Sequence, residues 1–277
     1  MRESNFFAPQ EIAQNLLAIG KIKCSLNFST VFILSVLAGV YIAIGAQLAT
    51  MVTHDLAKFA GAGLTRFVGG SVFSLGLMLV VIGGAELFTG NSLLMTGVVK
   101  GEIPLPVMLK NWLIVFGGNL LGSLLMVAVM FATGLWAVSS FEVGGRALML
   151  AYDKVNLPFW AAFSRGVLCN MLVCLAIWLS LASKDIAGKI LAIYFPIMAF
   201  VASGFEHSVA NMYFIPMGIL LKSQPAVVGM SGLAGDLEKL TWLGFLGNLL
   251  PVTLGNIVGG AFFVGAVYAF AYLRESG

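Results

Sequence analysis

Two stretches of this chain decide its fold: Gly84-Ala-Glu86-Leu-Phe-Thr-Gly-Asn91 and Gly204-Phe-Glu206-His-Ser-Val-Ala-Asn211. Both follow the pattern Gly-x-Glu-x-x-x-x-Asn, and both lie in the middle of long apolar segments. Ionisable side chains are costly inside a membrane and mark a transport pathway by default. We therefore interpret the chain as organised around two interrupted membrane segments.

The composition agrees with a protein that crosses the membrane several times. The chain has 277 residues, of which 60% are hydrophobic and 10% charged, and its mean hydropathy is +0.99. The net charge of +3 is scattered between apolar blocks, which excludes a nucleic-acid-binding face. Cys24, Cys169 and Cys174 form neither a disulfide framework nor a metal-binding pattern, and no removable signal peptide is apparent. No metal or cofactor is expected.

The order of apolar segments predicts an amphipathic helix followed by six spans. Residues 1–28 place Ile12, Leu16 and Ile19 on one helical face after Pro9, as in an interfacial anchor or a gating plug. Residues 29–273 are predicted to form the transmembrane channel domain. Its expected spans are about 29–52, a broken block from Phe67, 112–138, 158–182, a second broken block at 190–221, and 242–272.

The first block contains Gly83-Gly84 and Gly90, and the second contains Pro196, Gly204 and Pro216, which predicts that both blocks are broken helices. A helix can break at glycine where the freed backbone lines a protein-enclosed cavity. In the first block we expect two half-helices with Leu87-Phe88-Thr89 in the unwound loop, and a matching break over Gly204–Asn211.

The motifs also predict an inverted repeat. The interrupted motif recurs after 120 residues, and Gly118-Asn119-Leu-Leu-Gly122 is echoed by Gly255-Asn256-Ile-Val-Gly259 after 137. Each half, about 29–138 and 158–273, then has three spans, so the second half enters the membrane from the opposite side. The distribution of lysine and arginine favours cytoplasmic termini, in a plasma membrane.

The chain closely resembles the formate/nitrite transporter family at both interrupted motifs and at Gly166-Val-Leu-Cys-Asn-Met-Leu-Val-Cys-Leu-Ala-Ile-Trp178, within a similarity from about Phe28 to Arg274. The resemblance implies an all-α, aquaporin-like six-helix protomer in a homopentamer. Each protomer would have its own pore for small monovalent anions or their acids.

The resemblance also implies roles for single residues. Leu77, Leu87 and Phe200 match an apolar constriction on the cytoplasmic side, with Phe88 beside it, and Phe73 and Ala210 match the outer one. Thr89 and His207 match the polar pair between them, Lys154 a vestibule lysine, and Asn170 a polar lining residue. Leu87-Phe88 follows the formate-channel pattern, whereas Glu86 and Gly90-Asn91 are more similar to nitrite members.

Each of these residues also has a structural interpretation. His207 could be a buried core histidine, but its place in a helix break favours a functional role. Glu86 and Glu206, matched across the repeat with Asn91 and Asn211, are expected to be structural, capping backbone amides freed at each break. Lys154 lies in a predicted polar loop, where a solvated lysine is ordinary.

Formate is the substrate we expect, because Leu87, Phe88 and Phe200 would leave a narrow apolar passage. Nitrite, hydrosulfide, lactate and acetate are the alternatives. A membrane-embedded hydrolase using Glu206 and His207 is disfavoured, since the chain has neither His-Glu-x-x-His nor Gly-x-Ser-x-Gly. A water or glycerol channel would be expected to carry Asn-Pro-Ala at the breaks, and the chain has no Asn-Pro.

Overall fold

The computed structural model describes residues 5–233 and 237–273, which are almost entirely helical. The elements in chain order are α1 (Pro9–Ser25), α2 (Phe28–Thr53), α3 (Ala57–Gly83), α4 (Phe88–Asn91), η1 (Ser92–Leu94), α5 (Met95–Lys100), α6 (Leu105–Ala132), η2 (Leu135–Ala137), α7 (Glu142–Val155), α8 (Phe159–Ala182), α9 (Ile186–Ser203), α10 (Ser208–Leu221), α11 (Pro225–Ser231), α12 (Trp242–Ile257), the π-helix η3 (Val258–Ala266) and α13 (Val267–Tyr272).

Six helices in the described part of the chain are long and apolar enough to cross a membrane: α2, α3, α6, α8, α9 and the continuous stretch Trp242–Tyr272. A seventh apolar helix, α10, is too short to span alone. It continues the path of α9 after the second break, just as α4, η1 and α5 continue that of α3. The expected architecture, six membrane segments of which two are interrupted, is confirmed.

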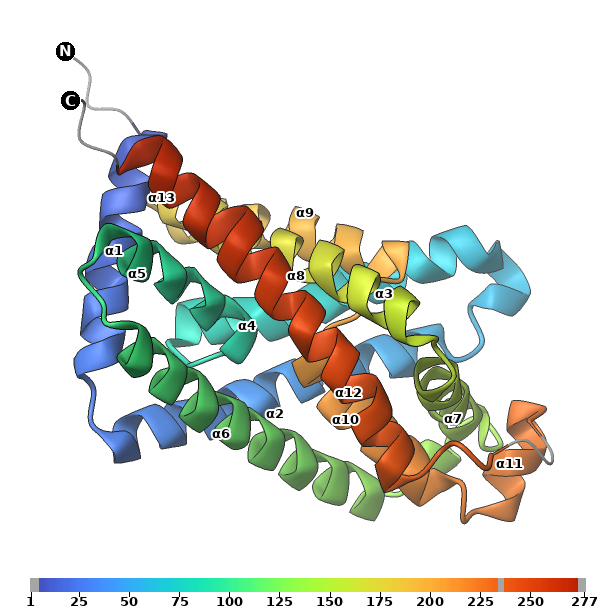
Figure 1. Cartoon of the computed structure of the whole chain (residues 1–277). Coiled ribbons are helices and arrows are strands. Elements are labelled where there is room, and N and C mark those ends of the chain that lie inside the picture. The colour runs from blue at the N-terminus through green and yellow to red at the C-terminus, as the bar shows by residue number, and fades with distance from the viewer. Residues whose placement is uncertain (1–4, 234–236, 274–277) are drawn as a thin grey trace.

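Two amphipathic helices lie at opposite ends of the bundle, α1 at one end and α7 at the other (Figure 1). We call these ends the α1 face and the α7 face. The helix predicted after Pro9 is present as α1, and it buries Ile12 and Leu16. Helix α7 was not expected, because residues 139–157 were predicted to be a loop. It buries Val143, Leu148 and Ala151, so its apolar side is packed although its other side is charged.

The two halves pack their spans through equivalent glycines. A Cβ atom on Gly122 of α6 would lie 2.0 Å from the carbonyl oxygen of Val36 on α2. A Cβ atom on Gly259 of η3 would lie 2.1 Å from the carbonyl oxygen of Val167 on α8. Only glycine permits helix backbones to approach this closely. The Gly-Asn-x-x-Gly motif thus has the same packing role in both halves.

Several boundaries differ from the sequence prediction. Helix α3 begins at Ala57 and helix α9 at Ile186, earlier than the blocks predicted from Phe67 and from 190. Helix α6 begins at Leu105 and ends at Ala132, earlier than the predicted 112–138, because its first turns after Pro104 are helical although they lie outside the most apolar stretch. The predicted loop 222–241 contains α11. The unwound part of the first break is 84–87, so Phe88 and Thr89 begin the next helix instead of lying in the loop.

Candidate functional site

Each break begins at a glycine in the left-handed backbone region. Gly84 has φ +79° and Gly204 has φ +76°, a conformation that strains residues with a Cβ atom. The chain then runs extended to Leu87 in the first break and His207 in the second, with φ of −109° and −112°. The two breaks therefore have the same backbone path.

A buried asparagine holds each break open. The Asn119 side chain accepts a hydrogen bond from the Phe88 backbone N–H at 2.9 Å and donates to the carbonyls of Glu86 at 3.0 Å and Ser35 at 2.8 Å. The bonds to Phe88 and Glu86 satisfy backbone groups that the helix interruption leaves unpaired, and the bond to Ser35 fixes the asparagine against α2. The first bond also explains why α4 restarts at Phe88. Sequence reasoning noted Asn119 in its motif but missed this role.

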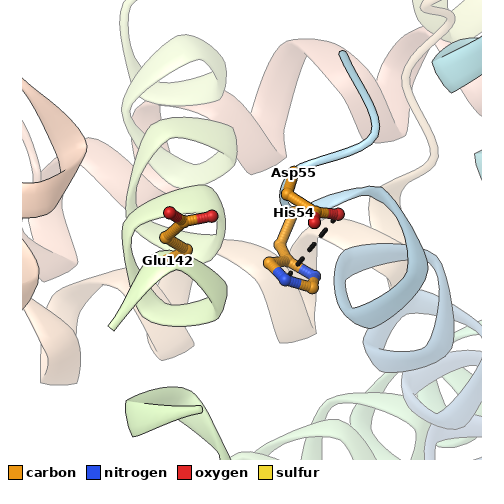
Figure 2. A group of neighbouring side chains, drawn as sticks. All are labelled: His54, Asp55 and Glu142. Atoms are coloured by element: carbon orange, nitrogen blue, oxygen red, sulfur yellow. Dashed lines mark ion pairs between the residues drawn. The ribbon is translucent and has the colours of Figure 1, made fainter. Parts of the chain in front are cut away.

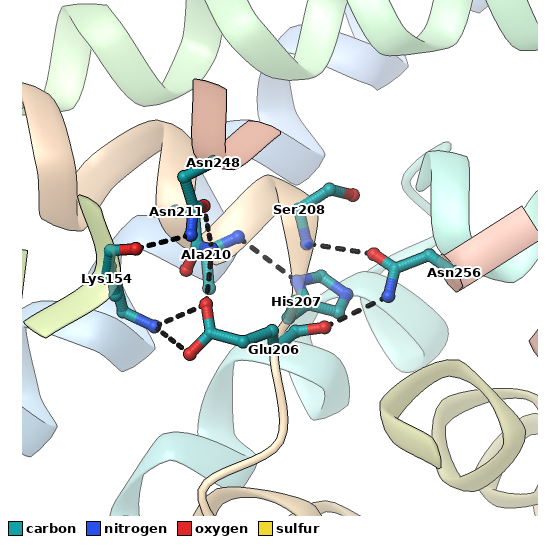
Figure 3. Close-up of polar contacts among 8 residues, drawn as sticks. All are labelled: Lys154, Glu206, His207, Ser208, Ala210, Asn211, Asn248 and Asn256. Carbon is teal, nitrogen blue, oxygen red and sulfur yellow. Dashed lines mark hydrogen bonds and ion pairs between the residues drawn. The ribbon is translucent and has the colours of Figure 1, made fainter. Parts of the chain in front are cut away.

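Asn256 has the equivalent role in the second half (Figure 3), and we call Asn119 and Asn256 the clamp asparagines. Its side chain accepts from the Ser208 backbone N–H at 2.9 Å and donates to the carbonyls of Glu206 at 3.0 Å and Gly166 at 2.8 Å. Asn170 connects this region to the first break, because its amide donates to the carbonyls of Asn256 at 2.7 Å and Thr89 at 3.2 Å. Asn170 was predicted to line the pore, and its contacts give it a clamping role as well.

On the α1 face, Glu86 belongs to a buried polar chain. Its carboxylate lies 3.0 Å from the ammonium of Lys23, at the end of α1, and accepts from Asn91 Nδ2 at 2.7 Å. Asn91 Nδ2 also donates to Asn111 Oδ1 at 2.9 Å, and its own Oδ1 accepts from Lys23 at 2.8 Å. The lysine therefore supplies the counter-charge that a buried carboxylate needs.

The α7 face has the same polar chain (Figure 3). Lys154, in the last turn of α7, binds both carboxylate oxygens of Glu206 at 2.9 and 3.1 Å. Asn211 Nδ2 donates to Glu206 at 2.6 Å and to Asn248 Oδ1 at 2.7 Å. Lys154 is thus helical and ion-paired, which corrects its predicted place in a loop.

These contacts revise two expectations. Glu86 and Glu206 were expected to cap backbone amides, but the hydrogen bonds of their carboxylates go to lysine and asparagine side chains. In addition, Lys23 and Lys154 stand 131 residues apart in equivalent roles, so α1 and α7 belong to the repeat. We propose that each repeated unit begins at its amphipathic helix, whereas the halves predicted from the sequence begin at 29 and 158.

Thr89 and His207 meet between the two breaks, where both are buried. Thr89 Oγ1 lies 2.9 Å from His207 Nε2. His207 Nδ1 is 3.1 Å from the Ala210 backbone N–H, which can only donate, so Nδ1 is the acceptor. A neutral ring consequently carries its proton on Nε2 and points it toward Thr89. The fold thereby fixes the tautomer of His207.

Apolar rings adjoin this pair. The ring of Phe200 lies 5.9 Å from that of His207, and the ring of Phe73 meets Phe200 edge-on at 5.7 Å. Leu77 and Leu87 are buried in the same core. The Phe88 ring instead contacts Phe116 at 4.9 Å and Trp112 at 6.0 Å on α6, so these contacts give it a packing role beside the first break.

A cavity of about 300 Å³ opens beside the first break on the α1 face. Its walls come from α1, the end of α3, the break itself, α4, the end of α8 and the start of α9. Cys24 of α1 adjoins Glu86 here. Burial raises the pKa of the Cys24 thiol, and the negative charge of Glu86 raises it further. The thiol therefore stays neutral and adds no charge to this region.

A second polar group lies on the α7 face (Figure 2). His54, Asp55 and Glu142 place nitrogen and carboxylate atoms within 4.8 Å of one another. Glu142 is already ion-paired to Lys58 at 2.7 Å, and His54 Nε2 is 3.1 Å from the Ser139 hydroxyl. We interpret the group as polar contacts that link the turn between α2 and α3 to the start of α7.

Two facing breaks, two polar chains and a central Thr–His pair define a membrane transport protein of the inverted-repeat class. Residues 10–270 match the family model described as "Formate/nitrite transporter". The chain belongs to the formate/nitrite transporter family.

Individual relatives agree with this assignment over nearly their whole length. The chain is 44% identical to a probable formate transporter of Methanothermobacter thermautotrophicus, covering 98% of this chain and 99% of the relative. It is 38% identical to the formate channel FocA of Escherichia coli K12, covering 97% and 95%. A solved pentameric formate channel with formate bound superposes with a TM-score of 0.82 at 38% identity, covering 89% of this chain and 98% of that one.

Proposed function

We propose that the protein conducts small monovalent anions, formate above all, through a pore in each protomer of a homopentamer. The observation that carries the proposal is the buried Thr89–His207 pair, which lies between the two breaks and beside the Phe200 ring. Similarity to proteins named as formate channels, one of them pentameric with formate bound, supports the substrate and the assembly. Nitrite and hydrosulfide are the alternative substrates within the family.

The passage of an anion follows from the hydrogen-bonding capacity of this pair. An unpaired carboxylate in an apolar pore is costly, whereas one that receives a hydrogen bond or a proton can cross. His207 Nε2–H and the Thr89 hydroxyl are donors buried between the two breaks. Phe200, Leu77 and Leu87 would exclude hydrated ions, since an ion must shed water to pass an apolar ring.

Catalysis by Glu206 and His207 is disfavoured by the same contacts. The Glu206 carboxylate is bound by Lys154 and Asn211, and His207 Nδ1 is bound by the Ala210 backbone, so neither is free to act as a base. We therefore propose a transporter without enzymatic activity. We also infer that both termini lie in the cytoplasm of a bacterial cell, with the α1 face inward, because the sequence assigns eight lysines and arginines to the loops and ends on that side of the predicted spans and six to the other side.

His207→Asn tests the mechanism most sharply. An asparagine can still accept from the Ala210 N–H and cap α10, but it lacks the Nε2 donor. Formate flux into proteoliposomes should fall and lose its dependence on pH, His207→Phe should behave likewise, and Thr89→Val should show a milder defect. If His207→Asn assembles normally and keeps the parent's rate and pH profile, His207 does not assist the anion.

A further inference from the structure

The cavity on the α1 face is larger than a small monovalent anion. Its volume of about 300 Å³ compares with a share of about 30 Å³ for one molecule of liquid water, so it has room for a small ion together with water. Leu16 and Ile19 of α1 and Val80 of α3 contribute apolar walls. Apolar walls have a low dielectric constant and strengthen the field of any charge inside.

Among the described residues, three ionisable ones line this cavity, and two of them neutralise each other. Lys23 and Glu86 form the ion pair at 3.0 Å described above. The third is Lys189, half-buried in the first turn of α9, for which the described part of the chain offers no carboxylate within 4.0 Å. Asp185, one turn earlier, caps α9 by accepting from the Gly188 N–H at 2.7 Å. The net charge of the cavity lining is therefore +1, and Lys189 carries it.

This charge breaks the symmetry of the repeat. Helix α9 leads into the second break as α3 leads into the first, and Gly204 corresponds to Gly84. With that offset of 120 residues, Lys189 corresponds to Gly69, which has no side chain. The cation of the α1 face thus has no counterpart at the equivalent position on the α7 face.

We propose that Lys189 is the anion-collecting residue of the α1-face cavity, where it holds a hydrated small monovalent anion next to the first break. It does so through charge, not through a fitted pocket, and it lowers the substrate concentration needed to load the pore from that face. This inference rests on the proposed function and adds a residue that determines how the two faces differ.

Flux measurements on uniformly oriented protein in phosphatidylcholine vesicles test the proposal, since these lipids add no anionic headgroup. At low ionic strength, Lys189→Gln should raise the half-saturating formate concentration from the α1 face about fivefold, keep the maximal rate, and leave the α7 face unchanged. At 1 M salt, where the Debye length is about 3 Å, the difference should vanish. Lys189→Arg should behave as the parent.

Lys110→Gln is the matched control, because Lys110 is an exposed lysine of α6 outside the cavity lining. The proposal is wrong if Lys189→Gln and Lys110→Gln have the same half-saturating formate concentration, or if that concentration rises equally from both faces. A second readout does not need transport: formate should slow the modification of Lys189 by pyridoxal phosphate, followed by mass spectrometry, but not that of Lys110. If formate protects Lys189 of the parent protein but the protein conducts no formate, only the proposed function is refuted. If formate does not protect Lys189, the role of Lys189 is refuted.

Discussion

Replacing Asn256 by leucine should lower the stability of the protein by more than the loss of one hydrogen bond would. The side chain is fully buried and makes three hydrogen bonds, to the Ser208 N–H and to the carbonyls of Glu206 and Gly166. Leucine has nearly the same volume but leaves the Ser208 N–H and the Glu206 carbonyl unpaired, whereas the Gly166 carbonyl keeps its helical partner inside α8. Buried unpaired groups cost about 1–3 kcal/mol each, whereas side-chain hydrogen bonds in membrane proteins average about 0.6 kcal/mol.

Three lost hydrogen bonds at about 0.6 kcal/mol set the lower limit and two unpaired groups at about 3 kcal/mol set the upper one, which gives a loss of about 2–6 kcal/mol for Asn256→Leu. Since about 1 kcal/mol shifts Tm by roughly 2–4 °C in a chain of this size, the apparent Tm should fall by roughly 4–24 °C. The assay is thermal unfolding of purified protein in detergent at one fixed heating rate, paired with formate flux. Flux should also fall, because Asn256 fixes the loop that carries His207.

Asn156→Leu is the control for this change. Asn156 lies at the end of α7, is half-buried, and donates a single hydrogen bond, to Tyr152 O at 3.0 Å. Its replacement should lower Tm by no more than a few degrees. If the Tm of Asn256→Leu falls by no more than that of Asn156→Leu, the buried amide does not stabilise the break, and the energetic reasoning is wrong.

Two further predictions concern the apolar ring and the α7-face ion pair. Leu87→Ala and Phe200→Ala should admit larger anions such as lactate and acetate, because both remove buried apolar bulk. The fluxes of a panel of anions measure this, and an unchanged selectivity would show that the constriction lies elsewhere. Lys154→Met should lower stability by about 3–5 kcal/mol, since it leaves Glu206 buried without a counter-charge. Adding Glu206→Gln should recover most of the lost Tm; a double variant as unstable as the single one would show that the unpaired charge is not the cause.

The membrane segments could be predicted because hydropathy reports them directly. The inversion followed from two motifs that recur in the same order. Gly84 and Gly204 also marked both breaks, because few other residues adopt the left-handed backbone that ends the preceding helix. The exact unwound residues could not be predicted, since the restart at Phe88 depends on Asn119, distant in sequence.

Helix α7 could not be predicted from composition, because its charged residues are as frequent as those of a polar loop. Its buried residues Val143, Ala147, Leu148 and Ala151 recur at helical spacing, which was the available signal. The partners of the two glutamates were missed for a related reason. Asn111 and Asn248 lie 137 residues apart, the same interval as the two clamp asparagines, but a lone asparagine at a helix start carries no local signature.

The identical backbone path of the two breaks has a consequence for how the two copies of the repeat diverged. Leu87 and His207 occupy the same position, each as the residue before the restarted helix, with φ/ψ of −109°/127° and −112°/116°. One copy has an aliphatic side chain there and the other a titratable ring. A scaffold that looks alike from either side gives no rectification of its own. Any preference for direction must come from the few positions at which the two copies no longer have the same chemistry.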